Sequence, residues 1–170
     1  EAYNLPQGVI SHMYRDIAAH NIGTITHVGL YTFADPRNGG GKLNDVTKED
    51  LVKVVEIEGQ ERLLYKAFPI NVVFLRASYA DEYGNCTVHR EIGPIDVTAM
   101  AQACKNSGGR VIVQVEKIVQ GGSLDPKLVA IPGIYVDSIV VGSIEDNEQC
   151  LGMPYDGSLT GEFRIPVDAI

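Results

Sequence analysis

The first strong pattern along the chain is helical. Apolar residues recur three or four positions apart at Val9, Met13 and Ile17, and charged residues lie on the other side. This spacing places the apolar side chains on one face and predicts a helix over residues 8–21. Gly23 follows the pattern and favours the end of that helix.

Strands are predicted where short runs of β-branched and aromatic residues lie between turn residues. The apolar run at residues 71–77 predicts a central strand of a sheet that is covered on both faces. Residues 54–65 predict a hairpin with its tip at residues 58–60. The remaining predicted strands span residues 25–33, 86–88, 110–119 and 134–141.

A second helix and several loops complete the predicted order of elements. Residues 94–106 have apolar residues at helical spacing, and Gly108 and Gly109 follow their end. Residues 47–53 predict a short helix or a turn. The glycine-rich segment 35–41 is expected to hold no regular structure.

Helices that alternate with buried strands predict an α/β fold. The expected architecture is an open, mostly parallel sheet flanked by helices, with hairpin insertions. The segment 145–160 is polar and rich in Asp, Asn, Gly and Ser, so it predicts a linker that follows the domain.

Charge and composition exclude several classes of function. The chain has 170 residues, enough for one domain, and a net charge of -8 with no basic stripe, which argues against binding to nucleic acid. The longest apolar runs have the length of strands, so no membrane span is predicted. Three widely spaced cysteines predict neither a disulfide framework nor a zinc site, and they favour a reducing cytoplasm. The four histidines show no metal-ligand spacing, so no metal site is expected.

One pair of polar residues lies within a predicted strand. Gln114 and Glu116 alternate with Val113 and Val115, so the polar pair faces away from the valines. Such a pair either lines a site near the end of a sheet or forms a solvent-facing edge, and the pattern favours the solvent-facing edge. The residues alone therefore predict no catalytic constellation.

Five blocks in the same order resemble class I CoA-transferases of the propionate, acetate and 3-oxoacid type, in which both halves form one chain. The resemblance covers nearly all of the sequence. Each block alone is weak, and the occurrence of all five in the order of the family makes the resemblance specific. The blocks are residues 4–12, 28–37, 80–85, 106–116 and 131–137.

This resemblance implies an activity and an incomplete site. Members of the family have an open α/β fold in each half and move CoA from an acyl-CoA to a free carboxylate through a glutamyl-CoA thioester. The catalytic glutamate of the family lies in the C-terminal half, and no glutamate of this sequence matches it. Residues 1–144 are thus expected to form part of the N-terminal half, and residues 145–170 the connection toward a missing C-terminal half.

The resemblance also assigns substrate-binding residues. Gln7 matches the glutamine that lies beside the reacting carboxylate in the family, and Gly8 follows it. Thr32 and Phe33 are expected near the acyl pocket, where Tyr31 replaces a smaller residue usual in the family. The alternative for Gln7 is a residue at the start of a helix that hydrogen-bonds the backbone.

The implied partners follow from the activity. CoA is expected as a thioester substrate, with no permanently bound cofactor, together with a short-chain carboxylate. The missing C-terminal half or a β-type subunit would supply the glutamate. The assembled enzyme is expected to be a cytoplasmic homo-oligomer. The isolated segment is expected to be inactive. Short-chain fatty acid or ketone-body metabolism fits this chemistry. Two alternatives stay open: an acyl-CoA hydrolase of the same architecture, and a non-catalytic scaffold subunit.

Overall fold

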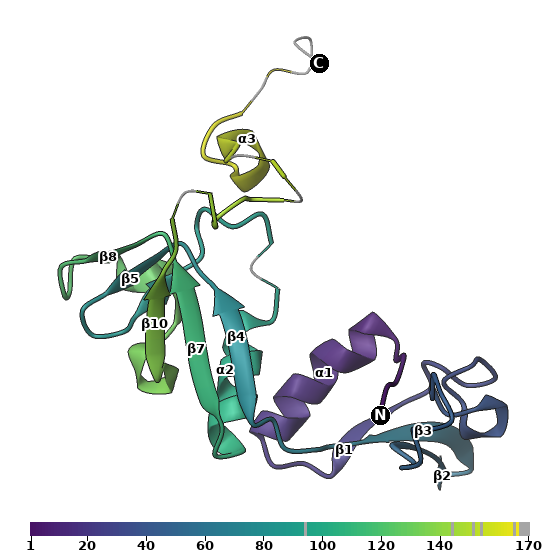
Figure 1. The fold of residues 1–170 in the computed structure, drawn as a ribbon. Helices are drawn as coiled ribbons and strands as arrows, with labels where there is room; N and C mark the ends of the chain where they lie inside the picture. The colour runs from purple at the N-terminus through teal and green to yellow at the C-terminus, as the bar shows by residue number, and fades with distance from the viewer. Residues whose placement is uncertain (94, 144, 151, 154, 165, 167–170) are drawn as a thin grey trace.

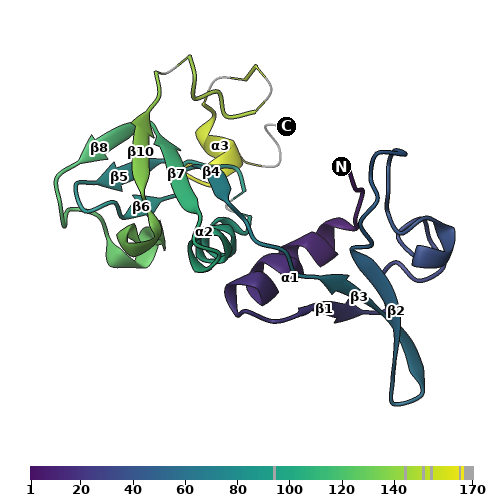
Figure 2. The same ribbon diagram turned by 60° about the horizontal axis from the view of Figure 1, so that its bottom comes forward.

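The computed structural model describes residues 1–93, 95–143, 145–150, 152–153, 155–164 and 166. Two groups of elements lie side by side (Figure 1). One group holds an antiparallel sheet and the first helix, and the other holds a parallel sheet and the second helix. Figure 2 shows the two helices adjacent to each other between the two sheets.

The first group is a helix packed on a three-stranded antiparallel sheet. Helix α1 spans Gln7–Ala18, and the strands are β1 (Gly23–Thr26), β2 (Val52–Ile57) and β3 (Gln60–Lys66), in the order β1-β3-β2. The apolar face of α1 covers one face of this sheet, as the helical spacing predicts. The buried residues of this core are Val9, Met13, Val52, Leu63 and Tyr65.

The second group is built on a three-stranded parallel sheet. Its strands are β4 (Val72–Arg76), β7 (Arg110–Val115) and β10 (Ser138–Val141), in the order β10-β7-β4. Helix α2 (Val97–Asn106) packs against one face of these strands and buries small side chains there. The buried valines of β7 alternate with less buried residues, so the core lies between this strand and α2.

A smaller four-stranded sheet continues from the carboxyl ends of β4 and β7. Its strands are β5 (Tyr79–Asp81), β6 (Cys86–Thr87), β8 (Lys117–Val119) and β9 (Val129–Ile131), in the order β8-β5-β6-β9. The remaining short elements are the 3-10 helices η1 (Pro36–Asn38), η2 (Pro126–Leu128) and η3 (Gly133–Tyr135), and the helix α3 (Gly157–Thr160).

Polar contacts join α1 to α2 and thus connect the two groups. The Ser11 hydroxyl donates to a carboxylate oxygen of Asp96 at 2.5 Å, and Arg15 forms an ion pair with the same carboxylate at 3.3 Å. At the other end, the Asn106 amide donates to the backbone carbonyl oxygen of Ala18 at 2.5 Å. Both ends of α2 are therefore held against α1.

The structure confirms the α/β class, both long helices and the hairpin. Helix α1 ends three residues before the predicted limit, and α2 begins at Val97, whereas Pro94 lies outside the described residues. The hairpin turn contains Glu58 and Gly59, which both have positive φ. Positive φ at both central residues is the requirement of the tight hairpin turn that matches strand twist.

The strand predicted at residues 25–33 is wrong beyond Thr26. Gly29 and Tyr31 have φ angles of 98° and 64°, and these positive values turn the chain away from an extended path. The apolar residues that suggested a buried strand are exposed instead, and Tyr31 is 73% exposed. The apolar residues alone thus predicted a strand where the chain forms a loop. The backbone of this loop is set by Gly29 and by contacts distant in sequence.

Among the elements that the structure describes, the strand predicted at residues 71–77 is neither central nor covered on both faces. Within the described residues β4 is the outer strand of the parallel sheet, and β7 is central. Val72 and Phe74 are 47% and 77% exposed. The run of apolar residues is explained by one face that packs on α2 and another that is bare.

Two further strand predictions are too long, and the short helix or turn predicted at residues 47–53 is wrong. The strand at residues 110–119 breaks at Glu116, whose amide donates to Ser78 and starts the turn into β8. Only Ser138–Val141 of the strand predicted at residues 134–141 is extended, because η3 precedes it. Residues 47–51 form no helix and lead into β2. No helix of the described chain is long and apolar enough to cross a membrane.

The turn at Glu58 and Gly59 generates a stability prediction. Gly59→Ala should lower the free energy of unfolding by about 1 kcal/mol, because a Cβ is strained at a φ of 74°. Gly93→Ala is the control, since its φ is not positive and a Cβ there would meet only ordinary contacts at 3.5 Å. Urea unfolding of both variants tests this, and equal stability of the two would contradict the turn geometry.

Candidate functional site

The first turn of α1 presents Gln7 and Gly8 at the surface. The carbonyl oxygen of Pro6 accepts hydrogen bonds from the amides of Val9 and Ile10 at 2.9 and 3.1 Å, so the first helical turn forms around exposed Gln7 and Gly8. A Cβ at Gly8 would meet no heavy atom within 4 Å. No hydrogen bond of the Gln7 side-chain amide is present among the described residues.

Thr32 and Phe33 lie on the loop that follows β1, and both are exposed. The Thr32 hydroxyl donates to the carbonyl oxygen of Gly29 at 2.8 Å and accepts from the amide of Ala34 at 3.2 Å. The Tyr65 hydroxyl donates to the carbonyl oxygen of Val28 at 2.9 Å from inside the core. These bonds give an irregular loop one defined conformation.

A fully buried carboxylate organises the same loop. Asp35 accepts hydrogen bonds from the amides of Tyr31 and Arg37 at 2.9 and 3.0 Å, and from the Arg37 guanidinium at 2.9 and 2.7 Å. The guanidinium also pairs with Glu61 on β3 at 3.2 Å, and it lies 5.1 Å from the centre of the Tyr31 ring. The hydrogen bonds from Arg37 hold the pKa of Asp35 well below its usual range.

The fold brings the two predicted blocks together. The amide of Asn4 donates to the carbonyl oxygen of Gly41 at 2.7 Å, so the glycine-rich loop closes on the segment before α1. A Cβ at Gly41 would come within 2.7 Å of the Asn4 carbonyl oxygen, which excludes a larger residue there. No hydrogen bond joins Gln7 or Gly8 to Thr32 or Phe33 among the described residues. The structure thus joins the segments that carry these residues through Gly41, without a direct polar contact between the two pairs.

A second carboxylate holds the turn after β5 in a similar way. Asp81 accepts from the amides of Tyr83 and Asn85 at 3.0 and 2.9 Å, from the Asn85 side chain at 3.0 Å, and from the amide of Gly122 at 3.4 Å. Burial opposes its charge, but the hydrogen bonds from Asn85 and from the backbone lower the pKa of Asp81. Asp81 is therefore a structural residue whose oxygens are already occupied.

A pocket of about 600 Å³ lies beyond the carboxyl ends of the parallel strands. Arg90 donates from Nε to both oxygens of Glu116 at 3.2 and 3.1 Å, and its guanidinium carbon lies 3.5 Å from the centre of the Tyr155 ring. Although burial opposes the charge of Arg90, the Glu116 carboxylate raises the pKa of the guanidinium. Ligands of α/β sheets commonly bind at this edge, so the pocket is a candidate site.

This pocket changes the interpretation of Gln114 and Glu116, the polar pair that was predicted to lie within one strand. Glu116 lines the pocket and is paired with Arg90, so the favoured solvent-facing edge is wrong for this residue. Gln114 donates to the backbone carbonyl oxygen of Asp146 and to the Asn147 side chain at 3.1 and 3.0 Å. The alternation of polar residues with valines indicated that Glu116 could line a site. Nothing in the local sequence indicated the same for Arg90.

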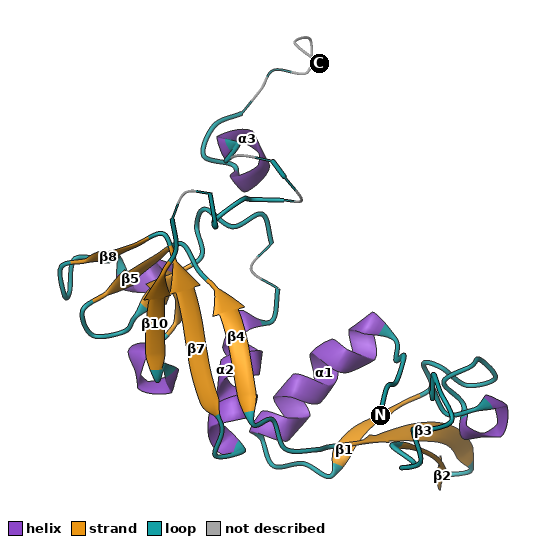
Figure 3. Cartoon of the chain, in the orientation of Figure 1, coloured by secondary structure: helices purple, strands orange, loops and turns teal. Residues whose placement is uncertain are grey.

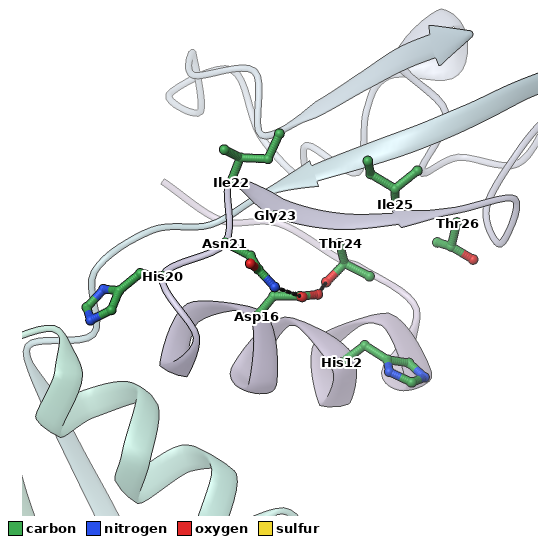
Figure 4. Close-up of a pocket in the computed structure, with 9 residues that line it drawn as sticks. All are labelled: His12, Asp16, His20, Asn21, Ile22, Gly23, Thr24, Ile25 and Thr26. Atoms are coloured by element: carbon green, nitrogen blue, oxygen red, sulfur yellow. Dashed lines mark hydrogen bonds between the residues drawn. The ribbon is translucent and has the colours of Figure 1, made fainter. Parts of the chain in front are cut away.

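A second pocket, of about 640 Å³, lies between α1 and β1 (Figure 4). Asp16 accepts from the Asn21 side chain at 2.9 Å and from the Thr24 hydroxyl at 2.5 Å, which ties the helix to the strand. His12 and His20 lie at opposite ends of the pocket and do not converge. No group of three histidine, cysteine or acidic residues in the described chain is placed to hold a metal ion.

Comparisons with known proteins agree on one family. Residues 1–142 match the family described as Coenzyme A transferase. The chain is 51% identical over 170 residues to the caffeate CoA-transferase of Acetobacterium woodii, covering 98% of this chain and 32% of that protein. It is 44% identical over 164 residues to the acetate CoA-transferase YdiF of Escherichia coli O157:H7, covering 96% of this chain and 31% of that protein.

A solved structure of the second relative has the same fold. The crystal structure of acyl-CoA transferase YdiF from Escherichia coli O157:H7, a thioester complex with CoA, matches with a TM-score of 0.91 and 45% identity. The match covers 96% of this chain and 34% of that chain. The chain therefore spans about a third of the length of the relatives that it matches most fully.

The Asp35 geometry generates a pH-dependent prediction. Asp35→Asn should lower the free energy of unfolding at pH 7 by about 2 kcal/mol, because the variant loses charge-assisted hydrogen bonds at a buried site. Since the pKa of Asp35 is lowered by folding, its contribution is present above the unfolded pKa of about 4 and is lost as the pH falls through the folded value. Urea unfolding at a series of pH values gives the difference in free energy of unfolding between the parent protein and Asp35→Asn. This difference should be constant from neutral pH to about pH 5 and smaller below about pH 4.

The control for this prediction is Asp45→Asn, at an exposed position of the same loop region. It should change the free energy of unfolding by no more than about 0.5 kcal/mol at any pH. The proposed role of the buried carboxylate would be contradicted if Asp35→Asn lost no more free energy of unfolding than Asp45→Asn. It would also be contradicted if the loss for Asp35→Asn grew on acidification.

Proposed function

The chain belongs to the Coenzyme A transferase family, and from this premise we propose that it forms the substrate-facing part of an acyl-CoA:carboxylate CoA-transferase. The enzyme would move CoA from a short-chain acyl-CoA or 3-oxoacyl-CoA to acetate or a similar acid. The observation that carries this proposal is the identity of 51% and 44% to two named CoA-transferases over nearly the whole chain.

The proposed reaction uses a glutamate outside residues 1–170. Its carboxylate attacks the thioester carbon, the CoA thiolate leaves, and an acyl-glutamyl anhydride forms. The thiolate then attacks the glutamyl carbonyl carbon and releases the acyl group as a free carboxylate, which leaves a glutamyl-CoA thioester. The acceptor acid reverses these steps and departs as the new acyl-CoA, so the sequence needs no oxidant and no water.

Three carboxylates and one thiol of this chain are buried or paired in ways that do not suit a nucleophile. Asp35 and Asp81 are fully buried and already accept several hydrogen bonds, and Glu116 is paired with Arg90. Burial raises the pKa of Cys86 to about 12, which keeps that thiol protonated at neutral pH. None of these groups offers a free, ionised nucleophile.

Gln7 is the residue of this chain that we place closest to the reacting atoms. Its amide is exposed and unpartnered in the described chain, and Gly8 beside it leaves open space. An amide N–H can donate to the oxygen of a thioester, whose negative charge grows during the attack. Thr32 and Phe33 would line the acyl pocket from the loop held by Asp35.

The partners that we propose follow from the same activity. Acyl-CoA and a short-chain carboxylate are substrates, with no resident cofactor, and the glutamate comes from a C-terminal half or from a β-type subunit. Residues 1–144 would belong to the N-terminal half, and residues 145–170 to the connection. We further propose a homo-oligomer in a reducing cytoplasm, which suits the buried free thiols of Cys86 and Cys104.

Intact mass spectrometry of the full-length protein tests the reaction. Addition of acetoacetyl-CoA should produce a covalent adduct of CoA mass, and peptide mapping should place it on a glutamate outside residues 1–170. An adduct inside these residues would disprove the position of the nucleophile, and the absence of any adduct would disprove the thioester mechanism. With acetate present, acetyl-CoA should form, whereas release of free CoA alone would identify a hydrolase.

Substitution of Gln7 tests its role. In the full-length enzyme, Gln7→Ala should lower kcat at least tenfold, about 1.4 kcal/mol of transition-state stabilisation, because one donor to the developing oxyanion is lost. Steady-state kinetics with acetyl-CoA and propionate provide the measurement. Gln120→Ala, at another exposed glutamine, is the matched control and should leave kcat unchanged. Equal kcat values for the two variants would exclude Gln7 from the site.

A further inference from the structure

Asp96, the residue before α2, has an unusual backbone for its place in the chain. Its φ of 56° lies in the left-handed region, and its carboxylate makes no hydrogen bond to the first turn of α2. An aspartate before a helix normally accepts such a bond. Among the described helices, Asp35, Asp125 and Asp156 do so before η1, η2 and α3. The Asp96 carboxylate is therefore committed to another contact.

That contact is with α1, which lies between the antiparallel sheet and α2 (Figure 3). The Ser11 hydroxyl donates to the Asp96 carboxylate at 2.5 Å, and Arg15 pairs with the same carboxylate at 3.3 Å. The Asp96 side chain is 8% exposed, whereas the Arg15 side chain is 60% exposed. An exposed ion pair contributes little, so the hydrogen bond from Ser11 is the stronger restraint.

Ser11 shares one face of α1 with Gln7. Residues four positions apart lie on the same side of a helix, about 6 Å apart along its axis, so Gln7, Ser11 and Arg15 form one row. The opposite side carries Val9 and Met13, which pack in the core of the first group. Apolar packing has no preferred direction, so it restrains the rotation of a helix about its axis less than a hydrogen bond does.

We infer that Asp96 is a positioning residue for Gln7. The bond from Ser11 fixes the rotation of α1 about its axis, and with it the direction of the Gln7 side chain one turn away. This inference rests on the proposed function, in which the Gln7 amide donates to the oxygen of the thioester. A sparsely populated backbone conformation persists only where the surroundings impose it, and such residues gather at functional sites. The left-handed φ of Asp96 agrees with this role.

Steady-state kinetics of the full-length enzyme with Asp96→Gly test this inference. Glycine suits the positive φ, so the variant removes the carboxylate without adding backbone strain. The kcat with acetyl-CoA and propionate should fall at least roughly fivefold, because a small displacement of a catalytic donor removes much of its effect. The KM for acetyl-CoA should change by less than about twofold, since the weakened interaction belongs to the transition state.

A double-mutant cycle shows whether Asp96 acts through Gln7. In a Gln7→Ala background, Asp96→Gly should lower kcat by less than about twofold, because the donor that it positions is already absent. The same loss in both backgrounds would assign Asp96 a general structural role and overturn the inference, while the proposed function would stand. An unchanged kcat for Gln7→Ala alone would remove Gln7 from the site, and the inference with it.

Two further variants serve as controls. Asp96→Asn retains an oxygen that accepts from Ser11, and asparagine tolerates the left-handed backbone, so kcat should stay within about threefold of the parent value. Asn106→Ala removes the bond to the carbonyl oxygen of Ala18, at the other end of α1 from Gln7, and should change kcat by less than about twofold. An equal loss of kcat in Asn106→Ala and Asp96→Gly would contradict local positioning.

Hydrogen exchange of the full-length protein gives a readout that does not depend on activity. Amides in the first two turns of α1 should exchange at least roughly threefold faster in Asp96→Gly than in the parent protein, because the restraint on this end of the helix is lost. Amides of β7 should exchange at the same rate in both proteins, which shows that the variant is folded. Equal exchange of the α1 amides in the two proteins would overturn the inference.

Discussion

Backbone amides in the irregular segments of this protein need acceptors that no strand ladder supplies, and buried carboxylates provide them. Asp35 accepts the amides of the loop that carries Thr32 and Phe33, and Asp81 does the same for the turn after β5. An unpaired buried amide would cost free energy comparable to a lost hydrogen bond. The conformation of the loop that carries Thr32 and Phe33 therefore depends on a buried charge.

Local patterns in the sequence predicted the elements whose structure is itself local. The helical spacing of Val9, Met13 and Ile17 and the hairpin around Gly59 agree with the structure. The loop at residues 27–34 was mistaken for a strand because its apolar residues resemble a buried run, and its backbone is set by Asp35 and Tyr65. Neither the local hydrogen bonds of Asp35 nor the long-range contact of Tyr65 leaves a periodic trace in the sequence.

The candidate site was predicted only partly for the same reason. Gln7 and Thr32 came from a resemblance, and the structure places their segments together through the Asn4–Gly41 hydrogen bond. The pocket at the carboxyl edge joins Arg90 to Tyr155, residues 65 positions apart, so no local motif could reveal it. Only the alternation around Glu116 gave a signal, because a polar residue at the end of a buried strand points toward that edge.

The parallel order β10-β7-β4 also has a kinetic consequence. Each of its pairings joins strands that are separated by a crossover of more than twenty residues, so none can form before a long loop closes. Folding rates fall as contacts become less local, and partly folded sheets expose apolar edges meanwhile. Among the described strands, β4 has no neighbour on its outer edge. Before the sheet is complete, this edge would be the surface at which a nascent chain contacts chaperones or other nascent chains.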